Sequence, residues 1–551
     1  MRATPRSRRR GHRPPPLTLT RPGASALTAA AAELPPPIEE PILEADEIQG
    51  NILPGFGTMH EALVGLRITD AAGGALHARR WLRELTPLIT SLRQLHTVRE
   101  MRRAVATATG ERPSRPEVLL NAALSAPALP LLGLPSENLP PLFLGGMTIA
   151  GLQDDLDAWG APVGWKFGAT TETTPHVLII IGAETPETLQ FALGSLKAST
   201  GLGSGFEVIY EDEGRRLPDD REHFGFRDGL SQPGVRGRLD EHPESFVTRR
   251  YFDPADPLAR RFSRPGEPLL WPGQFIFGYP THLDNDDETP GLKATPPQAW
   301  MVNGSFLTVR RLRQDVATFR AFSERQAQSV SAQLGRAVSQ DEIEAWLVGR
   351  WREGEPLVRC PVTPAPGHIS VEASLNHFDY ADPVPDVTVL LEGQAIRVSG
   401  APGDLSADRC PHFAHIRKVN LRDAPNDQGR PGLQFRLLRR GIPYGPAFVE
   451  GEGEPPDRGL LFLAYHRDLD RFMTLSASWM NSADAPEGHG HDLLVGQQRE
   501  APRSATRFPS APAPARLDAS AAERWIRATG GGFFFAPAKS VFRKLSLRRP
   551  D

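Results

Sequence analysis

The chain has 551 residues, with 63 basic and 66 acidic side chains and a formal net charge of −3. Such a balance gives no long-range electrostatic reason to expect a nucleic acid or an anionic membrane as partner. The two cysteines, Cys360 and Cys410, are too few for a disulfide scaffold and form no Cys-x-x-Cys metal site. No apolar stretch is long enough to span a bilayer.

The first 45 residues are rich in arginine and proline, and we expect them to form a disordered arm. Three arginines at 8–10 partly match a twin-arginine export signal, but prolines at 14–16 interrupt the apolar region that such a signal needs. We therefore favour an arm, and a cytoplasmic protein, over an exported one.

Hydrophobic patterning after the arm predicts one order of elements twice. In the first half we expect strands over 61–69, 117–124, 176–182 and 206–210, and helices over 75–92, kinked at Pro87, and over 186–199. In the second half we expect strands over 304–310, 434–438, 460–465 and 533–535, and helices over 314–334 and 468–480.

The order strand, helix, strand, strand, helix, strand is typical of a ferredoxin-like sheet. The predicted fold class is therefore α+β, with two tandem ferredoxin-like halves and antiparallel sheets. We place the halves at 46–235 and 301–545, the connecting segment at 236–300 and a tail at 546–551. A Pro/Ala-rich stretch over 500–515 predicts a loop.

Three segments carry polar side chains of the kinds used in catalysis. Taken singly, each has an ordinary structural interpretation: Asp228-Gly229 as a turn, His415 in a basic loop as a packed histidine, and Arg439-Arg440 as solvated residues at a strand end. A zinc site would need further His, Cys or Asp ligands at short spacing around His415, and the sequence offers no such set.

Taken together, the three segments resemble the dye-decolorizing peroxidase family. Gly225-x-x-Asp228-Gly229 matches its GxxDG signature, Ala414-His415-Ile-Arg-Lys418 matches the segment with the proximal haem ligand, and Arg439-Arg440-Gly441 matches the segment with the distal arginine. The resemblance runs from about residue 46 to 545. It departs at Asn420-Leu421-Arg422, where the family usually has Asn-Pro-Arg, and at about twenty extra residues around 385–405, which we expect to form a surface hairpin.

The resemblance implies a haem b cofactor in a pocket formed mainly by the second half. His415 would bind the iron, and Asp468 or Asp470 would accept a hydrogen bond from its other ring nitrogen. Asp228 would move the peroxide proton, and Arg439 would stabilise the departing oxygen. The remaining implied cofactor-binding residues are Gly229, Ser305, Arg350, Leu460 and Phe462.

The implied activity is reduction of hydrogen peroxide coupled to one-electron oxidation of bulky aromatic or dye-like substrates through a ferryl intermediate. Partners would be peroxide and an organic reductant, with no nucleic acid or membrane, and a homo-oligomer is compatible. Two alternatives stay open. One is a haem carrier or iron-releasing protein on the same fold. The other is an assembly module, for instance cargo of a protein shell, docked by the tail at 544–551, although a frayed basic terminus is favoured.

Overall fold

The computed structural model describes residues 38–547 apart from short gaps. The gaps are 70–72, 112, 114–116, 151, 153–161, 201–204, 284–285, 365–371, 392–393, 425–431, 452–455, 498–501, 508–513 and 521–522. Most of the predicted arm, residues 1–37, lies outside the described part of the chain. Within the arm's last residues, Glu40 and Leu43 are buried, and Ile42 bridges to Arg238.

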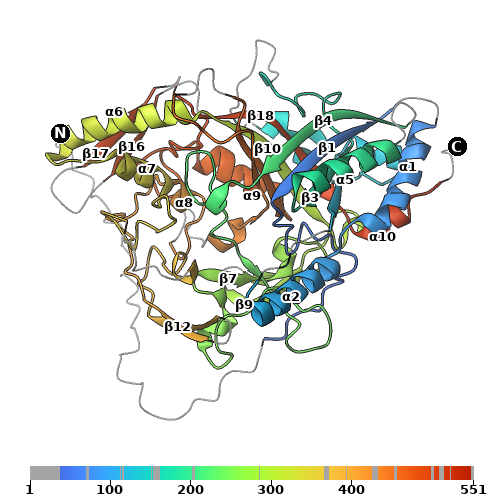
Figure 1. The fold of residues 1–551 in the computed structure, drawn as a ribbon, viewed down its shortest axis with the longest axis horizontal. Coiled ribbons are helices and arrows are strands. Elements are labelled where there is room, and N and C mark those ends of the chain that lie inside the picture. Colours follow the sequence, from blue (N-terminus) through green and yellow to red (C-terminus); the bar gives the residue numbers. More distant parts are fainter. Residues whose placement is uncertain are drawn as a thin grey trace, which may run out of the picture. The chain divides into compact units, whose positions relative to one another are not determined.

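In the first half, an antiparallel sheet of long strands is covered by the helices α1 (Gly74–Leu85) and α5 (Pro186–Ser199) (Figure 1). The strands β1 (His60–Ile68), β2 (Leu119–Leu124), β3 (Val177–Ala183) and β4 (Phe206–Arg215) pair antiparallel in the order β2-β3-β1-β4. All four strand predictions and the α5 prediction are confirmed. The α5 start is fixed by Thr185, whose side chain accepts the N–H of Thr188.

The predicted kinked helix over 75–92 is wrong beyond Leu85. The chain makes a 3-10 turn over Thr86–Leu88 and starts a second helix, α2 (Leu92–Thr109). Ser91 and Gln94 form a capping box at the start of α2, with each side chain bonded to the other residue's backbone N–H. Pro87 has no N–H to donate, so a new helix with its own cap replaces a kink.

The second half contains β10 (Ser305–Gln314), α6 (Val316–Leu334), β15 (Gly459–His466), α9 (Leu469–Met473) and β18 (Ile526–Ala536). A π-helical turn, Thr474–Trp479, extends α9. The strand predicted over 434–438 is wrong at its start, because Gly432–Phe435 is a 3-10 turn. Extended backbone begins only at β13 (Leu438–Arg439) and resumes at β14 (Ile442–Tyr444), and both pair with β15.

The two sets of strands join at both edges. Phe535 of β18 pairs with Leu124 of β2, and Tyr444 of β14 pairs with Gly214 of β4. Because β10 also pairs with β15, these strands close into one ring. One face of every ring strand contributes to a single buried cluster, which includes Leu63, Ile180, Val309, Leu463 and Phe534. The interior of the ring is therefore filled with side chains.

Alternate residues of the same strands point outward, as the two-residue period of a strand requires. On the first half the outward residues, such as Val64 and Ile179, pack with Trp81 of α1 and Leu189 of α5. On the second half the outward side of β10 and β15 bounds a cavity instead.

Shorter elements complete the described fold. The segment over 385–405 contains the hairpin β11 (Val387–Leu391) and β12 (Gln394–Val398), which confirms the expected hairpin. The predicted loop over 500–515 is wrong in part, since β16 (Arg503–Arg507) pairs with β17 (Ala515–Ala519). The other described elements are α3 (Ala128–Leu132), α4 (Pro141–Gly145), β5 (Gly234–Val235), β6 (Phe262–Arg264), β7 (Glu267–Leu270), β8 (Pro280–Leu283), β9 (Asp286–Lys293), α7 (Gln340–Val348), α8 (His415–Lys418) and α10 (Lys539–Arg543). Of the helices in the described residues, none is both long and apolar enough to cross a membrane.

Candidate active site

A cavity of about 310 Å³ lies against the outer face of the second half. Arg310, Leu312 and Gln314 reach it from β10, and Leu460 and Phe462 reach it from β15. A volume of this size is typical of a small-molecule site. The loop over 222–233 of the first half forms another part of the wall, so both halves contribute to one site, the second half more than the first.

His415 enters the cavity from the first residue of α8. Its Nδ1 lies 2.7 Å from Oδ2 of Asp492, which is fully buried. The other oxygen of Asp492 accepts the backbone N–H groups of Leu494 and Val495. Because the carboxylate can only accept, Nδ1 carries the proton and Nε2 has a lone pair available for a metal ion.

The expected partner of His415 was therefore wrong. Asp468 caps α9 instead, accepting the N–H of Asp470, and lies outside the cavity lining. Asp492 follows His415 by 77 residues and sits in a loop with no periodic pattern. In the sequence, Asp492 stands in a short run of histidine, glycine and aspartate, and this pattern is too weak to identify it as the partner of His415.

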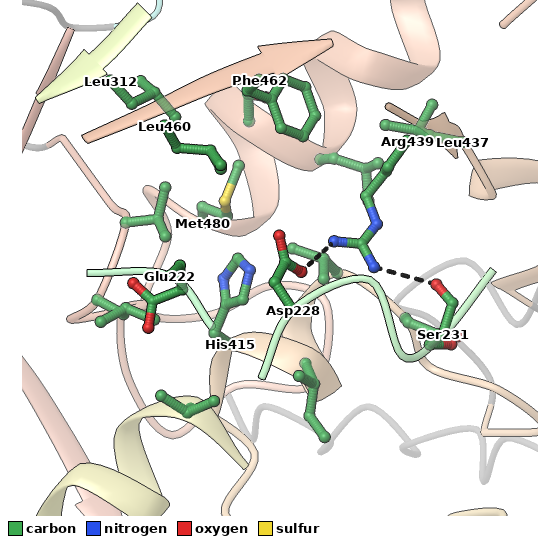
Figure 2. Close-up of a pocket in the computed structure, with 18 of the residues that line it drawn as sticks. Glu222, Asp228, Ser231, Leu312, His415, Leu437, Arg439, Leu460, Phe462 and Met480 are labelled. Atoms are coloured by element: carbon green, nitrogen blue, oxygen red, sulfur yellow. Dashed lines mark hydrogen bonds and ion pairs between the residues drawn. The ribbon is translucent and has the colours of Figure 1, made fainter. Parts of the chain in front are cut away.

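Asp228 and Arg439 form an ion pair in the same cavity, with Oδ1 and Nη1 3.0 Å apart (Figure 2). The same Oδ1 accepts the N–H of Gly229 at 2.6 Å, and Arg439 also donates to the carbonyl of Ser231. Burial raises the pKa of Asp228, but the charge of Arg439 and the Gly229 N–H outweigh burial and leave that pKa below its usual value. Asp228 is therefore ionised at neutral pH and can accept a proton.

Glycine is required at two positions in the Asp228 loop. Gly225 and Gly229 have φ values of 95° and 73°, in the left-handed region that side chains with a Cβ rarely adopt. A Cβ at Gly225 would also lie 2.5 Å from the guanidinium of Arg352. The GxxDG pattern thus encodes the backbone path that presents Asp228 to the cavity.

Three buried arginines line one part of the cavity: Arg350, Arg422 and Arg436. Burial, together with the charge of Arg422, lowers the pKa of Arg350 and of Arg436 to about 9. The Nε of Arg436 is buried without a hydrogen-bond partner among the described residues. The carboxyl of Asp379 lies 4.0 Å from Arg422, and although burial raises its pKa to about 6, it is mostly ionised at neutral pH; a single negative charge then faces three guanidinium groups. This surplus of positive charge fits a ligand with carboxylate groups.

Most of the sequence-predicted site residues meet in this cavity. His415, Asp228, Gly229, Arg439, Arg350, Leu460 and Phe462 all line it. Ser305 does not. It lies at the start of β10, on the opposite face of the strand from Arg310 and Leu312. Its side chain is fully buried and donates a hydrogen bond to the carbonyl of Phe306. We correct its predicted role accordingly.

Comparison with known proteins points to one enzyme family. The model of the carboxy-terminal region of Dyp-type peroxidases matches residues 284–489. A dye-decolorizing peroxidase of Mycetinis scorodonius is 27% identical, over 96% of this chain and 90% of its own length. One of Auricularia auricula-judae is also 27% identical, over 96% of this chain and 92% of its own. The chain is therefore similar to dye-decolorizing peroxidases over nearly its whole length.

Solved structures of this family share the fold. An ancestral D-type dye-decolorizing peroxidase superimposes with a TM-score of 0.70 at 26% identity, covering 92% of this chain and all of the other. A dye-decolorizing peroxidase in complex with 2,6-dimethoxyphenol gives a TM-score of 0.66 at 25% identity, covering 92% of this chain and 100% of the other. These similarities support an enzyme of the peroxidase class, and the family that they point to implies haem and iron.

Proposed function

We propose that the enzyme uses haem b to reduce hydrogen peroxide and to oxidise bulky aromatic or dye-like reductants one electron at a time. The observation that carries the proposal is the cavity itself, where a carboxylate-backed histidine and an Asp–Arg pair meet between apolar side chains. A related enzyme binds 2,6-dimethoxyphenol, which supports a phenolic reductant. A haem carrier would need His415 but neither Asp228 nor Arg439.

The histidine, the arginines and the Asp228–Arg439 pair described above each have a role in this proposal. His415 would hold the iron through Nε2, and Asp492 would keep the ring in the required tautomer. Arg350, Arg422 and Arg436 would pair with the propionates. Bound haem would supply the iron that takes up peroxide and the capacity to store two oxidising equivalents.

On the peroxide side, the chemistry belongs to the Asp228–Arg439 pair. Ionised Asp228 would take the proton from the inner oxygen of peroxide and return it to the outer oxygen, so that this oxygen leaves as water. Arg439 would stabilise the negative charge that develops there. Leu460 and Phe462 would limit access of bulk water from the β15 side.

We also infer that the two halves are tandem ferredoxin-like units, at 46–235 and 301–545, joined by 236–300. The order β2-β3-β1-β4 supports this for the first half. The order β18-β10-β15 followed by β14 supports it for the second half. Both are the arrangement expected of a strand-helix-strand repeat folded on itself.

The test of the function is the absorption spectrum of the haem-loaded enzyme before and after one equivalent of hydrogen peroxide. We expect a ferric, histidine-ligated spectrum that changes within the mixing time and returns when a phenolic reductant is added. A haem spectrum indifferent to peroxide would favour a carrier. Failure to bind haem would refute the cofactor assignment.

Replacement of Asp492 by Asn should weaken haem binding by about 10–100-fold, the usual cost of losing the partner of a metal-ligating histidine. The amide would keep the size of the side chain but remove the charge that fixes Nδ1–H of His415. Haem titration of the full-length protein measures the effect. Asp484→Asn is a matched control, because Asp484 is close in sequence and does not line the cavity. Equal affinities for D492N and wild type would contradict the role.

In Arg439→Leu, the rate of the reaction with peroxide should begin to fall at a higher pH on the acidic side of its pH profile. In the wild type Asp228 stays ionised until the pH falls below its usual pKa, because Arg439 lowers that pKa. Without Arg439, burial is uncompensated, so the pKa rises and the base form is lost at a higher pH. Stopped-flow rates across the acidic and neutral range report the shift, with Arg320→Leu, at a partly exposed ion pair, as control. An unmoved acid limb would mean that Asp228 is not the group that titrates.

A further inference from the structure

A second carboxylate from the Asp228 loop lines the same cavity. Glu222 precedes Asp228 by six positions, and its carboxylate points in a different direction from that of Asp228 (Figure 2). Its Oε1 accepts the N–H of Phe226, and its Oε2 accepts the N–H of Phe224, both at 2.9 Å. Oε2 also accepts Nε2 of Gln314 at 2.6 Å. These three donors are neutral, and none of the described cations forms an ion pair with Glu222.

The charged groups around Glu222 are otherwise engaged or like-charged. Arg221 pairs with Glu353, and Arg352 pairs with Glu344. Asp228 adds negative charge from the same loop. The cavity also contains Arg227 of the same loop, Arg310 on β10, His415 on α8 and Arg439, which pairs with Asp228. The other charged or titratable residues that line it are Arg350, Tyr380, Arg422 and Arg436. Arg310 has its own contact with the sulfur of Met147.

The two carboxyl groups of this loop therefore have pKa values that lie far apart. Burial raises the pKa of Glu222 to about 7, an effect that the three neutral donors reduce and the charge of Asp228 reinforces. The pKa of Asp228 lies below its usual value because of Arg439. Near neutral pH, Asp228 is charged while Glu222 exchanges its proton readily. Carboxylates whose environments separate their pKa values in this way commonly divide acid and base roles between them.

The reaction needs a second group of this kind. Reduction of hydrogen peroxide to two waters consumes two electrons and two protons. Each molecule of a phenolic reductant gives up one electron and one proton, so two molecules balance the reaction. The first water needs only a shift of the peroxide's own proton, which Asp228 can perform. The second oxygen must then receive both remaining protons inside a buried cavity.

We propose that Glu222 is the proton-transfer group of the reductive half of the reaction, giving protons to the cavity as the reductant supplies electrons and being reprotonated from solvent or from the reductant itself. This role rests on the proposed peroxidase function and is separate from that of Asp228. A carboxyl group that is half-protonated near neutral pH is well suited to it, since it donates and recovers a proton at similar cost.

The test compares Glu222→Gln with Glu353→Gln in haem-loaded, full-length enzyme. Glu353 is an exposed carboxylate paired with Arg221, so its substitution makes the same chemical change near the loop but outside the cavity. The two phases are followed separately by stopped flow: the reaction with peroxide, and the return to the ferric spectrum with 2,6-dimethoxyphenol.

In the wild type the rate of the second phase should fall as the pH rises through about 7. E222Q should lose this dependence and be slower by about 10-fold or more in mildly acidic buffer, with its first phase retained. E353Q should match the wild type.

Two further measurements separate proton transfer from support of the loop. Gln314→Leu keeps the carboxyl group but removes a donor that lowers its pKa, so the limb near pH 7 should move to higher pH. Infrared difference spectra of the wild type should show a protonated carboxyl band that disappears as the pH rises through about 7 and is absent from E222Q.

An E222Q profile identical to the wild type, or a wild type without that infrared band, would overturn the role of Glu222. A wild type that binds haem but does not react with peroxide would overturn the proposed function as well. The infrared band distinguishes the two failures, because it is measured without peroxide.

Discussion

Replacement of Asp228 by Asn should slow the reaction with hydrogen peroxide by on the order of 10²–10⁴-fold, the usual contribution of a positioned acid–base group. Asn keeps the size of the side chain and can still accept the N–H of Gly229, so the loop and the haem affinity should be retained. It cannot take a proton from peroxide, because an amide is not a base near neutral pH. Stopped-flow mixing of haem-loaded variant with peroxide measures the rate.

A matched control lies at the other end of the same turn. Asp220 is paired with Arg216, its carbonyl accepts the N–H of Asp228, and its side chain is outside the cavity lining. Asp220→Asn should therefore react at the wild-type rate. A D228N rate equal to that of D220N would contradict the acid–base role, and proton movement would then have to be assigned to Arg439 or to water.

Replacement of His415 by Ala should abolish native iron ligation and produce the largest loss of haem among the variants considered. His415 is the one histidine that lines the cavity in the described part of the chain, so no other described imidazole can replace it. Haem titration and the absorption spectrum of the full-length variant report the loss. The vacated space adjoins Asp492, which can still accept a hydrogen bond, so added imidazole should partly restore a histidine-like spectrum.

His412→Ala provides the comparison for this variant. His412 precedes His415 by three residues, stacks on His489 and does not line the cavity. Its replacement should leave haem binding within a few-fold of wild type. Retention of a native-like spectrum in H415A without added imidazole would refute the assignment of the iron ligand.

Local elements could be predicted because local patterns encode them. The continuous apolar run at β3 and the capped start of α5 are properties of adjacent residues, and both lie where expected. Closure of the ring was not predictable, because it depends on two short pairings, Phe535 with Leu124 and Tyr444 with Gly214, between residues that are far apart in the chain. Periodicity within a strand does not specify which strand lies next to it.

The site residues also fall into those that the local sequence predicted and those that it did not. Asp228, His415 and Arg439 stand in segments whose residue order carries information, and the fold brings all three to one cavity. Asp492 was missed because its relation to His415 exists only in three dimensions. Ser305 was wrongly predicted to line the cavity, because a motif does not state which face of a strand its residues occupy. In β10 this side chain lies on the face opposite the cavity.

The closed ring also bears on how the enzyme acquires its cofactor. The ring interior is already packed with side chains, and the cavity lies on the outer face of β10 and β15. No prosthetic group is required to fill the centre of the scaffold. We therefore expect the apoprotein to fold cooperatively by itself and to capture haem afterwards as a docking event. Cofactor supply would then limit the fraction of active enzyme without limiting its biosynthetic yield.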